Sequence, residues 1–123
     1  MARIKTVLRR ANGRQKDKAL QVFDLLLDPT SHRISIEDKP LEMGPTEFRL
    51  LKFFMLNQEK VFSRDHIQDA VWGVNVYLEE RTIDVHIRRL RKALSSIENT
   101  AIDYAKLVQT VRGAGYRFSV RPH

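Results

Sequence analysis

The chain has 123 residues, of which 42% are hydrophobic and 30% charged, the balance of one ordinary globular domain. It contains no cysteine, which excludes disulfide scaffolds, thiolate zinc sites, iron–sulfur clusters and cysteine nucleophiles and favours a reducing compartment. No apolar run approaches the roughly 20 residues needed to cross a bilayer, and the N-terminus has no signal-peptide segment, so we expect a cytoplasmic protein without membrane contact.

The net charge of +7 is unevenly distributed along the chain. Residues 1–18 carry seven Lys and Arg against one acid, residues 19–80 six against eleven, and residues 81–123 nine against three. An acidic body with a basic final third indicates a directed surface rather than general adhesion to polyanions. Nucleic acid is the partner that this pattern favours, and solvated surface charge is the alternative.

The first ten residues predict a short basic amphipathic helix, with Ile4, Val7 and Leu8 at helical spacing. The polar residues that follow, to Lys18, predict a linker. So short a helix is marginal in water and needs a surface to pack on. A membrane would bury only its three apolar side chains, which is weak anchoring.

Three short strands are predicted next, in an antiparallel meander with one covered face. They are Ala19–Leu27, Arg33–Ile36 and Leu41–Met43, separated by turns at Asp28–Ser31 and Asp38–Pro40.

Three helices follow the strands. The first begins after Gly44-Pro45, with Thr46 as a candidate cap, and runs to about Asn57. The second is capped by Ser63 and stops at Gly73. The third runs from about Arg81 to at least Leu94.

The third helix is the most informative element. Its core face is formed by Ile83, Ile87, Leu90 and Leu94, and the opposite face carries cations around one valine, Val85. These cations are Arg81, Arg88, Arg89 and Lys92, with Arg91 on one flank and His86 on the other. Valine gains nothing in water there, whereas in a major groove it can meet a thymine methyl group while arginines bind guanine edges or phosphates. A charged outer face with one accidental valine is the alternative.

The C-terminal residues predict a β-hairpin of Leu107–Val111 and Tyr116–Val120. The turn between them, Arg112–Gly115, places an arginine near the tip, where it could enter a minor groove.

No catalytic constellation is present in the sequence. The four histidines are scattered, and HExxH, GxSxG and GxxxxGK[ST] motifs are absent. Glu79 and Glu80 are better explained as favourable charges before a helix than as an acid–base pair. We therefore expect neither an enzyme nor a bound metal or cofactor.

Four motifs in order, GPTEFRLLKFF, SRDHIQDAVWG, RTIDVHIRRLRKAL and VQTVRGAGYRF, resemble the effector domain of OmpR/PhoB-type response regulators over about Leu20–Val120. The resemblance implies an α+β fold: a winged helix-turn-helix with an N-terminal antiparallel sheet, three helices and a C-terminal hairpin wing. The segments LDPTSHR, LEMGPTEF and VWGVNVYLEERTIDVHIRRLRKAL are similar to the phosphate-regulon members of this family.

The resemblance also implies sequence-specific binding to duplex DNA, with two copies head-to-tail on direct repeats, and activation of phosphate-starvation genes. Helix 81–94 would enter the major groove, where Arg89 contacts a base and Val85 packs on thymine, and Arg112 would enter the minor groove. Phosphates or base edges would be held by Arg81, Thr82, His86, Arg88, Arg91, Lys92 and Thr110. The loop 72–80 would meet the sigma subunit of RNA polymerase, with Trp72, Gly73, Leu78, Glu79 and Glu80 as its candidate contacts; a plain connector is the alternative.

Residues 1–18 would be the last helix of a receiver domain with its linker, and residues 19–123 the effector domain. The link Ser95–Lys106 is longer than usual in the family. Two other functions stay open: a basic RNA-associated protein without preference among duplex DNA sequences, and a membrane-surface or protein-interaction module that uses the N-terminal helix.

Overall fold

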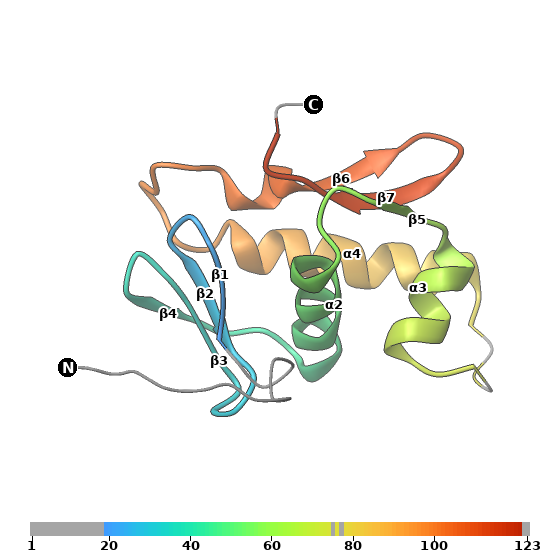
Figure 1. Ribbon diagram of the computed structural model, residues 1–123, viewed down its shortest axis with the longest axis horizontal. Coiled ribbons are helices and arrows are strands. Elements are labelled where there is room, and N and C mark those ends of the chain that lie inside the picture. The colour runs from blue at the N-terminus through green and yellow to red at the C-terminus, as the bar shows by residue number, and fades with distance from the viewer. Residues whose placement is uncertain (1–18, 75, 77, 122–123) are drawn as a thin grey trace.

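The computed structural model describes residues 19–74, 76 and 78–121. A four-stranded sheet, three α-helices and a three-stranded sheet follow one another along the chain (Figure 1). The predicted N-terminal helix and its linker lie outside the described residues. None of the helices in this described part is long and apolar enough to span a bilayer.

The N-terminal sheet is antiparallel, as predicted, and its strands lie in chain order. It consists of β1 (Leu20–Val22), β2 (Leu25–Asp28), β3 (Arg33–Ile36) and β4 (Lys39–Leu41). Alternation places Leu25 and Leu27 of β2 opposite Ile36 and Ile34 of β3, and all four side chains are buried. This covered face packs toward the helices.

The number of strands was predicted wrongly. Ala19–Leu27 is two strands, because the chain reverses at Phe23-Asp24, where Phe23 has a positive φ of 53°. The Asp24 amide donates to the hydroxyl of Tyr104, 80 residues away, and this tertiary contact supports the turn. The last strand is Lys39–Leu41 rather than Leu41–Met43, because the turn lies earlier, at Glu37-Asp38.

The helices are α2 (Pro45–Leu56), α3 (Arg64–Val71) and α4 (Glu80–Leu94). Ser63 caps α3 as predicted, since its hydroxyl accepts a hydrogen bond from the His66 amide at 3.1 Å. The predicted cap at Thr46 is wrong: the N-cap of α2 is Gly44, with Pro45 in the first helical position, where its missing N–H costs nothing.

The predicted C-terminal hairpin is confirmed as β6 (Val108–Val111) and β7 (Gly115–Phe118). We call this hairpin and its turn, residues 108–118, the wing. A strand that we did not predict, β5 (Val61–Phe62), pairs with β7 and completes the sheet in the order β5-β7-β6. The long link after α4 contains a 3₁₀ helix, η2 (Tyr104–Leu107).

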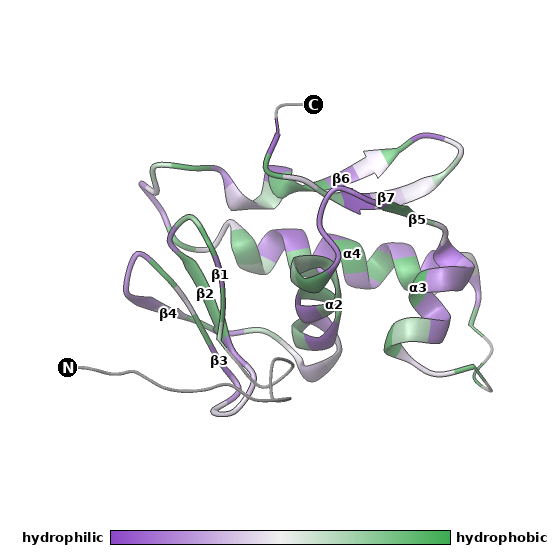
Figure 2. Cartoon of the chain, viewed as in Figure 1, coloured by the Kyte–Doolittle hydropathy of each residue, from purple (hydrophilic) through white to green (hydrophobic). Residues whose placement is uncertain are grey.

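One hydrophobic core joins these parts; α2 lies between the N-terminal sheet and α3, and α4 runs across behind α2 (Figure 1). Leu50, Leu51 and Phe54 of α2 are fully buried, as is Phe118 of β7. Figure 2 shows apolar residues along the strands of the N-terminal sheet and alternating polar and apolar stripes on α4. The core therefore fixes α4 by one face and leaves its other face for contacts.

Candidate nucleic-acid interface

The two faces of α4 are as different as the sequence predicts. Ile83, Ile87, Leu90 and Leu94 are each at most 1% exposed and point into the core. The opposite face forms an outer strip, in which four cations are exposed and Thr82 and Val85 are partly exposed. We define the outer strip as Arg81, Thr82, Val85, Arg88, Arg89 and Lys92.

Arg91, on one flank of α4, binds the wing. Its Nε donates to the carbonyl oxygen of Val108 at 2.9 Å, and one terminal nitrogen donates to Oγ1 of Thr110 at 2.8 Å. Both Arg91 and Thr110 were predicted to contact phosphates or base edges. In this structure Arg91 and Thr110 bind one another, and this contact holds the wing beside α4.

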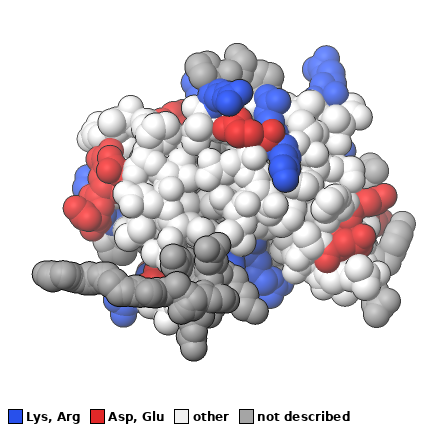
Figure 3. Space-filling view, in the orientation of Figure 1, with Lys and Arg blue, Asp and Glu red and all other residues white. Residues whose placement is uncertain are grey.

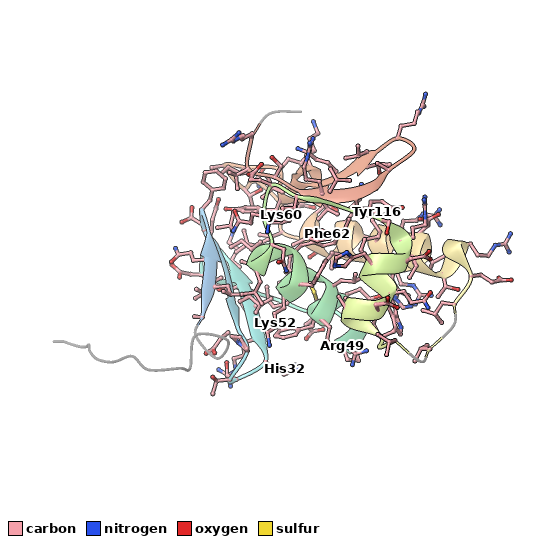
Figure 4. All side chains as sticks on the ribbon, turned by 45° about the vertical axis from the view of Figure 1, so that its right-hand side comes forward. His32, Arg49, Lys52, Lys60, Phe62 and Tyr116 are labelled. Atoms are coloured by element: carbon pink, nitrogen blue, oxygen red, sulfur yellow. The ribbon has the colours of Figure 1, made fainter. Side chains whose placement is uncertain are left out.

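Asp84 connects the same flank to two further elements. Its carboxylate accepts a hydrogen bond from Nε of Arg64 on α3 at 2.8 Å and another from the hydroxyl of Tyr116 on β7 at 2.5 Å. The guanidinium carbons of Arg64 and Arg91 lie 5.5 and 5.8 Å from the centre of the Tyr116 ring, within cation–π range. Figure 4 shows Tyr116 of the wing near Phe62, on the side of the wing that faces α3.

Burial and hydrogen bonds shift the acidity of these groups. Partial burial raises the pKa of Asp84, but the hydrogen bonds from Arg64 and Tyr116 outweigh it and hold the pKa below the ordinary aspartate value. Burial, with the hydrogen bond to Asp84, raises the pKa of Tyr116. Burial lowers the pKa of Arg91. At neutral pH the network thus holds a carboxylate, a neutral phenol and two guanidinium cations.

Arg64, Asp84 and Tyr116 were not predicted as part of the site. Arg64 and Tyr116 lie 20 and 32 residues from Asp84, and no spacing rule links such positions. The position of Asp84 beside the cations of α4 was the one available signal.

His86, on the other flank of α4, binds α2. Its Nδ1 lies 2.6 Å from Oε2 of Glu47, whose side chain is only 8% exposed, while the His86 side chain is 19% exposed. The Trp72 ring, at the start of the loop before α4, lies 5.4 Å from the imidazole, centre to centre. The two flanks of α4 are therefore attached to different neighbours, and the outer strip lies between them.

The tip of the wing is a tight turn that exposes Arg112. The Ala114 amide donates to the Val111 carbonyl at 2.9 Å, and Gly113 takes a positive φ of 79°. Gly115 has a φ of 138°, and a Cβ there would overlap the carbonyl oxygen of Phe62 on β5. Both glycines thus serve backbone geometry.

The loop between α3 and α4 is held mainly by Gln68. Its side chain donates to the Val76 carbonyl and accepts from the Leu78 amide at 3.3 Å. Trp72, Gly73 and Leu78 are partly exposed and Glu79 is exposed, while the side chain of Glu80 lies outside the described part. The loop thus presents Glu79 at the surface beside the start of α4.

Charge is spread unevenly over the surface as well as along the chain. In Figure 3 acidic side chains lie at the two ends of the molecule and also among the basic ones on the upper edge, which carries the wing, and further basic side chains lie on the lower side. Among the residues that the structure describes, no group of three or more His, Asp or Glu could hold a metal ion.

Comparison with known proteins places this geometry in a family. Residues 38–118 match the family "Transcriptional regulatory protein, C terminal". Over 121 residues the chain is 57% identical to the phosphate regulon transcriptional regulatory protein PhoB of Pseudomonas aeruginosa, a match that covers 98% of this chain and 50% of that protein. The chain thus spans about half the length of this relative.

Two solved structures with similar folds are DNA-binding domains. That of CpxR from E. coli has a TM-score of 0.66 and 31% identity, covering 82% of this chain and 95% of its own. That of the response regulator AdeR, in complex with an intercistronic region, has a TM-score of 0.67 and 27% identity, covering 80% and 96%. The chain belongs to the winged-helix C-terminal domains of OmpR/PhoB-type transcriptional regulators, a class of regulators and not of enzymes.

Proposed function

We propose that this chain binds duplex DNA sequence-specifically and regulates transcription through that binding. The observation that carries the proposal is the outer strip of α4, where four exposed cations surround a partly exposed valine while hydrogen bonds hold both flanks of the helix. A rigid helix with this surface fits a major groove, where arginine can bind guanine edges and valine can pack on a thymine methyl group.

Within this proposal the side chains of the outer strip divide by role. Arg89 contacts a base and Val85 packs on thymine. Arg81, Thr82, Arg88 and Lys92 hold phosphates or base edges, and the exposed Arg112 reaches the adjacent minor groove, where narrow grooves attract guanidinium groups.

His86, Arg91 and Thr110 keep their proposed role at the DNA backbone, but each acts from a fixed position. Hydrogen bonds already orient these side chains in the free protein, and therefore less conformational entropy is lost when they bind a phosphate.

The likeness to PhoB supports the finer part of the proposal: activation of phosphate-starvation genes, by two copies arranged head-to-tail on direct repeats. The loop 72–80 would then contact the sigma subunit of RNA polymerase through Trp72, Gly73, Leu78, Glu79 and Glu80. A protein with this function would act in the cytoplasm, where bacterial DNA lies.

Selection from random duplexes, at physiological salt and with nonspecific competitor, tests DNA binding. We expect enrichment of one motif, repeated in direct orientation at a fixed spacing. Equal competition by scrambled duplexes, or tighter binding to folded RNA, would overturn the proposal.

The loop assignment is tested by Glu79→Lys. We expect this variant to bind the selected duplex as the unchanged chain does, because Glu79 lies outside the outer strip, and to lose transcription in a reconstituted assay with polymerase. Loss of duplex binding instead would assign the loop to DNA.

A further inference from the structure

The contact between His86 and Glu47 has a chemical consequence that depends on the proposed binding of DNA. Glu47 is a buried carboxylate on α2, and the distance of 2.6 Å from its Oε2 to Nδ1 of His86 requires a proton between the two atoms. Nδ1 is therefore committed to Glu47. Nε2, which diverges from Nδ1 across the ring, is the one ring nitrogen left for a ligand.

We propose that Glu47 makes DNA binding proton-linked, with His86 taking up a proton when its Nε2 donates to a DNA phosphate. A neutral imidazole has one N–H. On Nδ1 that proton serves Glu47 and leaves a bare lone pair on Nε2 facing the phosphate. On Nε2 it serves the phosphate and leaves the Nδ1 lone pair against a buried carboxylate. Only the imidazolium satisfies both anions.

The surroundings of His86 identify Glu47 as the charge that matters. The other described contact of His86 is with Trp72, which is uncharged. Among the charged side chains of α3, Arg64 binds Asp84 and His66 lies against Phe62, while Asp65 and Asp69 are exposed. On α2, Arg49 and Lys52 lie two and five residues from Glu47 and therefore on other sides of that helix.

The remaining charged groups lie elsewhere around α4. The wing, with Arg112 and Arg117, packs on the flank of Asp84 and Arg91, opposite His86. The 3₁₀ helix η2, which carries Lys106, lies toward the C-terminal end of α4 (Figure 1). On α4 itself, Arg89 is one turn from His86, and its positive charge disfavours protonation of the imidazole. The negative charges of the phosphate and of Glu47 both offset this repulsion.

The direction of the pH effect follows from linkage. Since the bound state holds the proton more tightly than the free state, affinity is greatest at low pH and falls as pH rises through the range in which histidine titrates. Uptake of one proton corresponds to at most a tenfold loss of affinity per pH unit. Glu47 is a positioning residue in this scheme, because it acts through His86.

The experiment measures the dissociation constant of the full chain for a fluorescent duplex obtained by the selection above, from pH 5.5 to 8.5 at constant ionic strength. We expect the affinity to fall with pH, with a slope approaching tenfold per unit. Glu47→Gln should flatten the slope, and His86→Gln should remove it. His66→Gln is the matched control, since it removes a histidine outside the site and should keep the full slope.

A full slope in His86→Gln, or no slope in the unchanged chain, would overturn the inference while leaving DNA binding intact. Failure to bind any selected duplex at every pH would instead overturn the proposed function. Should Glu47→Gln not fold, ¹⁵N NMR of the unchanged chain decides: we expect both ring nitrogens of His86 to keep their protons to a higher pH in the complex than in the free chain. A His86 that loses a proton at the same or a lower pH in the complex contradicts the proposal.

Discussion

Gly115 shows how a single residue position controls the C-terminal sheet. Its backbone lies against the Phe62 carbonyl with a φ of 138°, so that a side chain meets both an unfavourable dihedral and an occupied space. Gly113, two residues earlier, also has a positive φ but has open space around its Cβ position. Substitution of Gly113 therefore tests backbone strain alone, and substitution of Gly115 tests strain together with steric overlap.

We expect Gly115→Ala to lower the free energy of unfolding by more than the about 1–3 kcal/mol typical of backbone strain, because overlap with β5 is added. Gly113→Ala should cost about 1 kcal/mol. Urea denaturation of both variants checks this, and equal losses would contradict a close approach between β5 and β7.

Arg89 is the residue expected to recognise a base. Arg89→Ala should weaken binding to the selected duplex by about 1–3 kcal/mol and relax its sequence preference, because a bidentate base contact is lost. Arg33→Ala removes the same charge from an exposed position on β3 and should leave specificity unchanged. Fluorescence anisotropy with selected and scrambled duplexes measures both, and a uniform loss over all sequences would assign Arg89 to a phosphate instead.

At the scale of elements, Asp84 joins α4 to α3 and to the wing. Because its folded pKa is below the ordinary value, its contribution to stability is present above the unfolded pKa and is lost as pH falls through the folded pKa. We expect Asp84→Asn to be less stable than the unchanged chain at neutral pH, by about 1 kcal/mol or less since the group is 36% exposed.

The stability difference between Asp84→Asn and the unchanged chain should shrink in acid, below the ordinary aspartate pKa. Thermal unfolding at a series of pH values follows it. Asp69→Asn, which removes an exposed carboxylate from α3, is the control. A constant difference at all pH values would mean that the hydrogen bonds of Asp84 do not depend on its charge.

Elements whose apolar residues recur regularly over many positions could be predicted from the sequence. Short elements that depend on contacts with distant residues could not. The core face and the outer strip of α4 follow from spacing alone, as does the cap at Ser63. The two-residue strand β5 exists only because β7 lies beside it, and the turn at Phe23-Asp24 has no glycine to reveal it. For the same reason the sequence offered the cations of the site but not the side chains that hold them in place.

Over the whole molecule, the cations of the outer strip and the wing should together attract the DNA phosphates, so that affinity depends on salt. Each phosphate contact that is removed lowers the slope of log affinity against log salt by about one. We expect this change for Lys92→Ala, an exposed member of the outer strip, with similar losses on all sequences. Titrations from 50 to about 200 mM salt measure the slope. Arg33→Ala should leave the slope unaltered, and an equal change in both variants would indicate net charge rather than a local contact.

The pairing of β5 with β7 also bears on synthesis of the protein. Val61 lies opposite Arg117, and the fully buried Phe118 follows at once, so that core contacts of β5 and α2 await residues much later in the sequence. Such distant pairings slow folding. On a ribosome the contacts of β5 with β7 and of Phe54 with Phe118 form only after residues 108–118 leave the exit tunnel, and the apolar side chains that these contacts cover are exposed to aggregation and to chaperones until then.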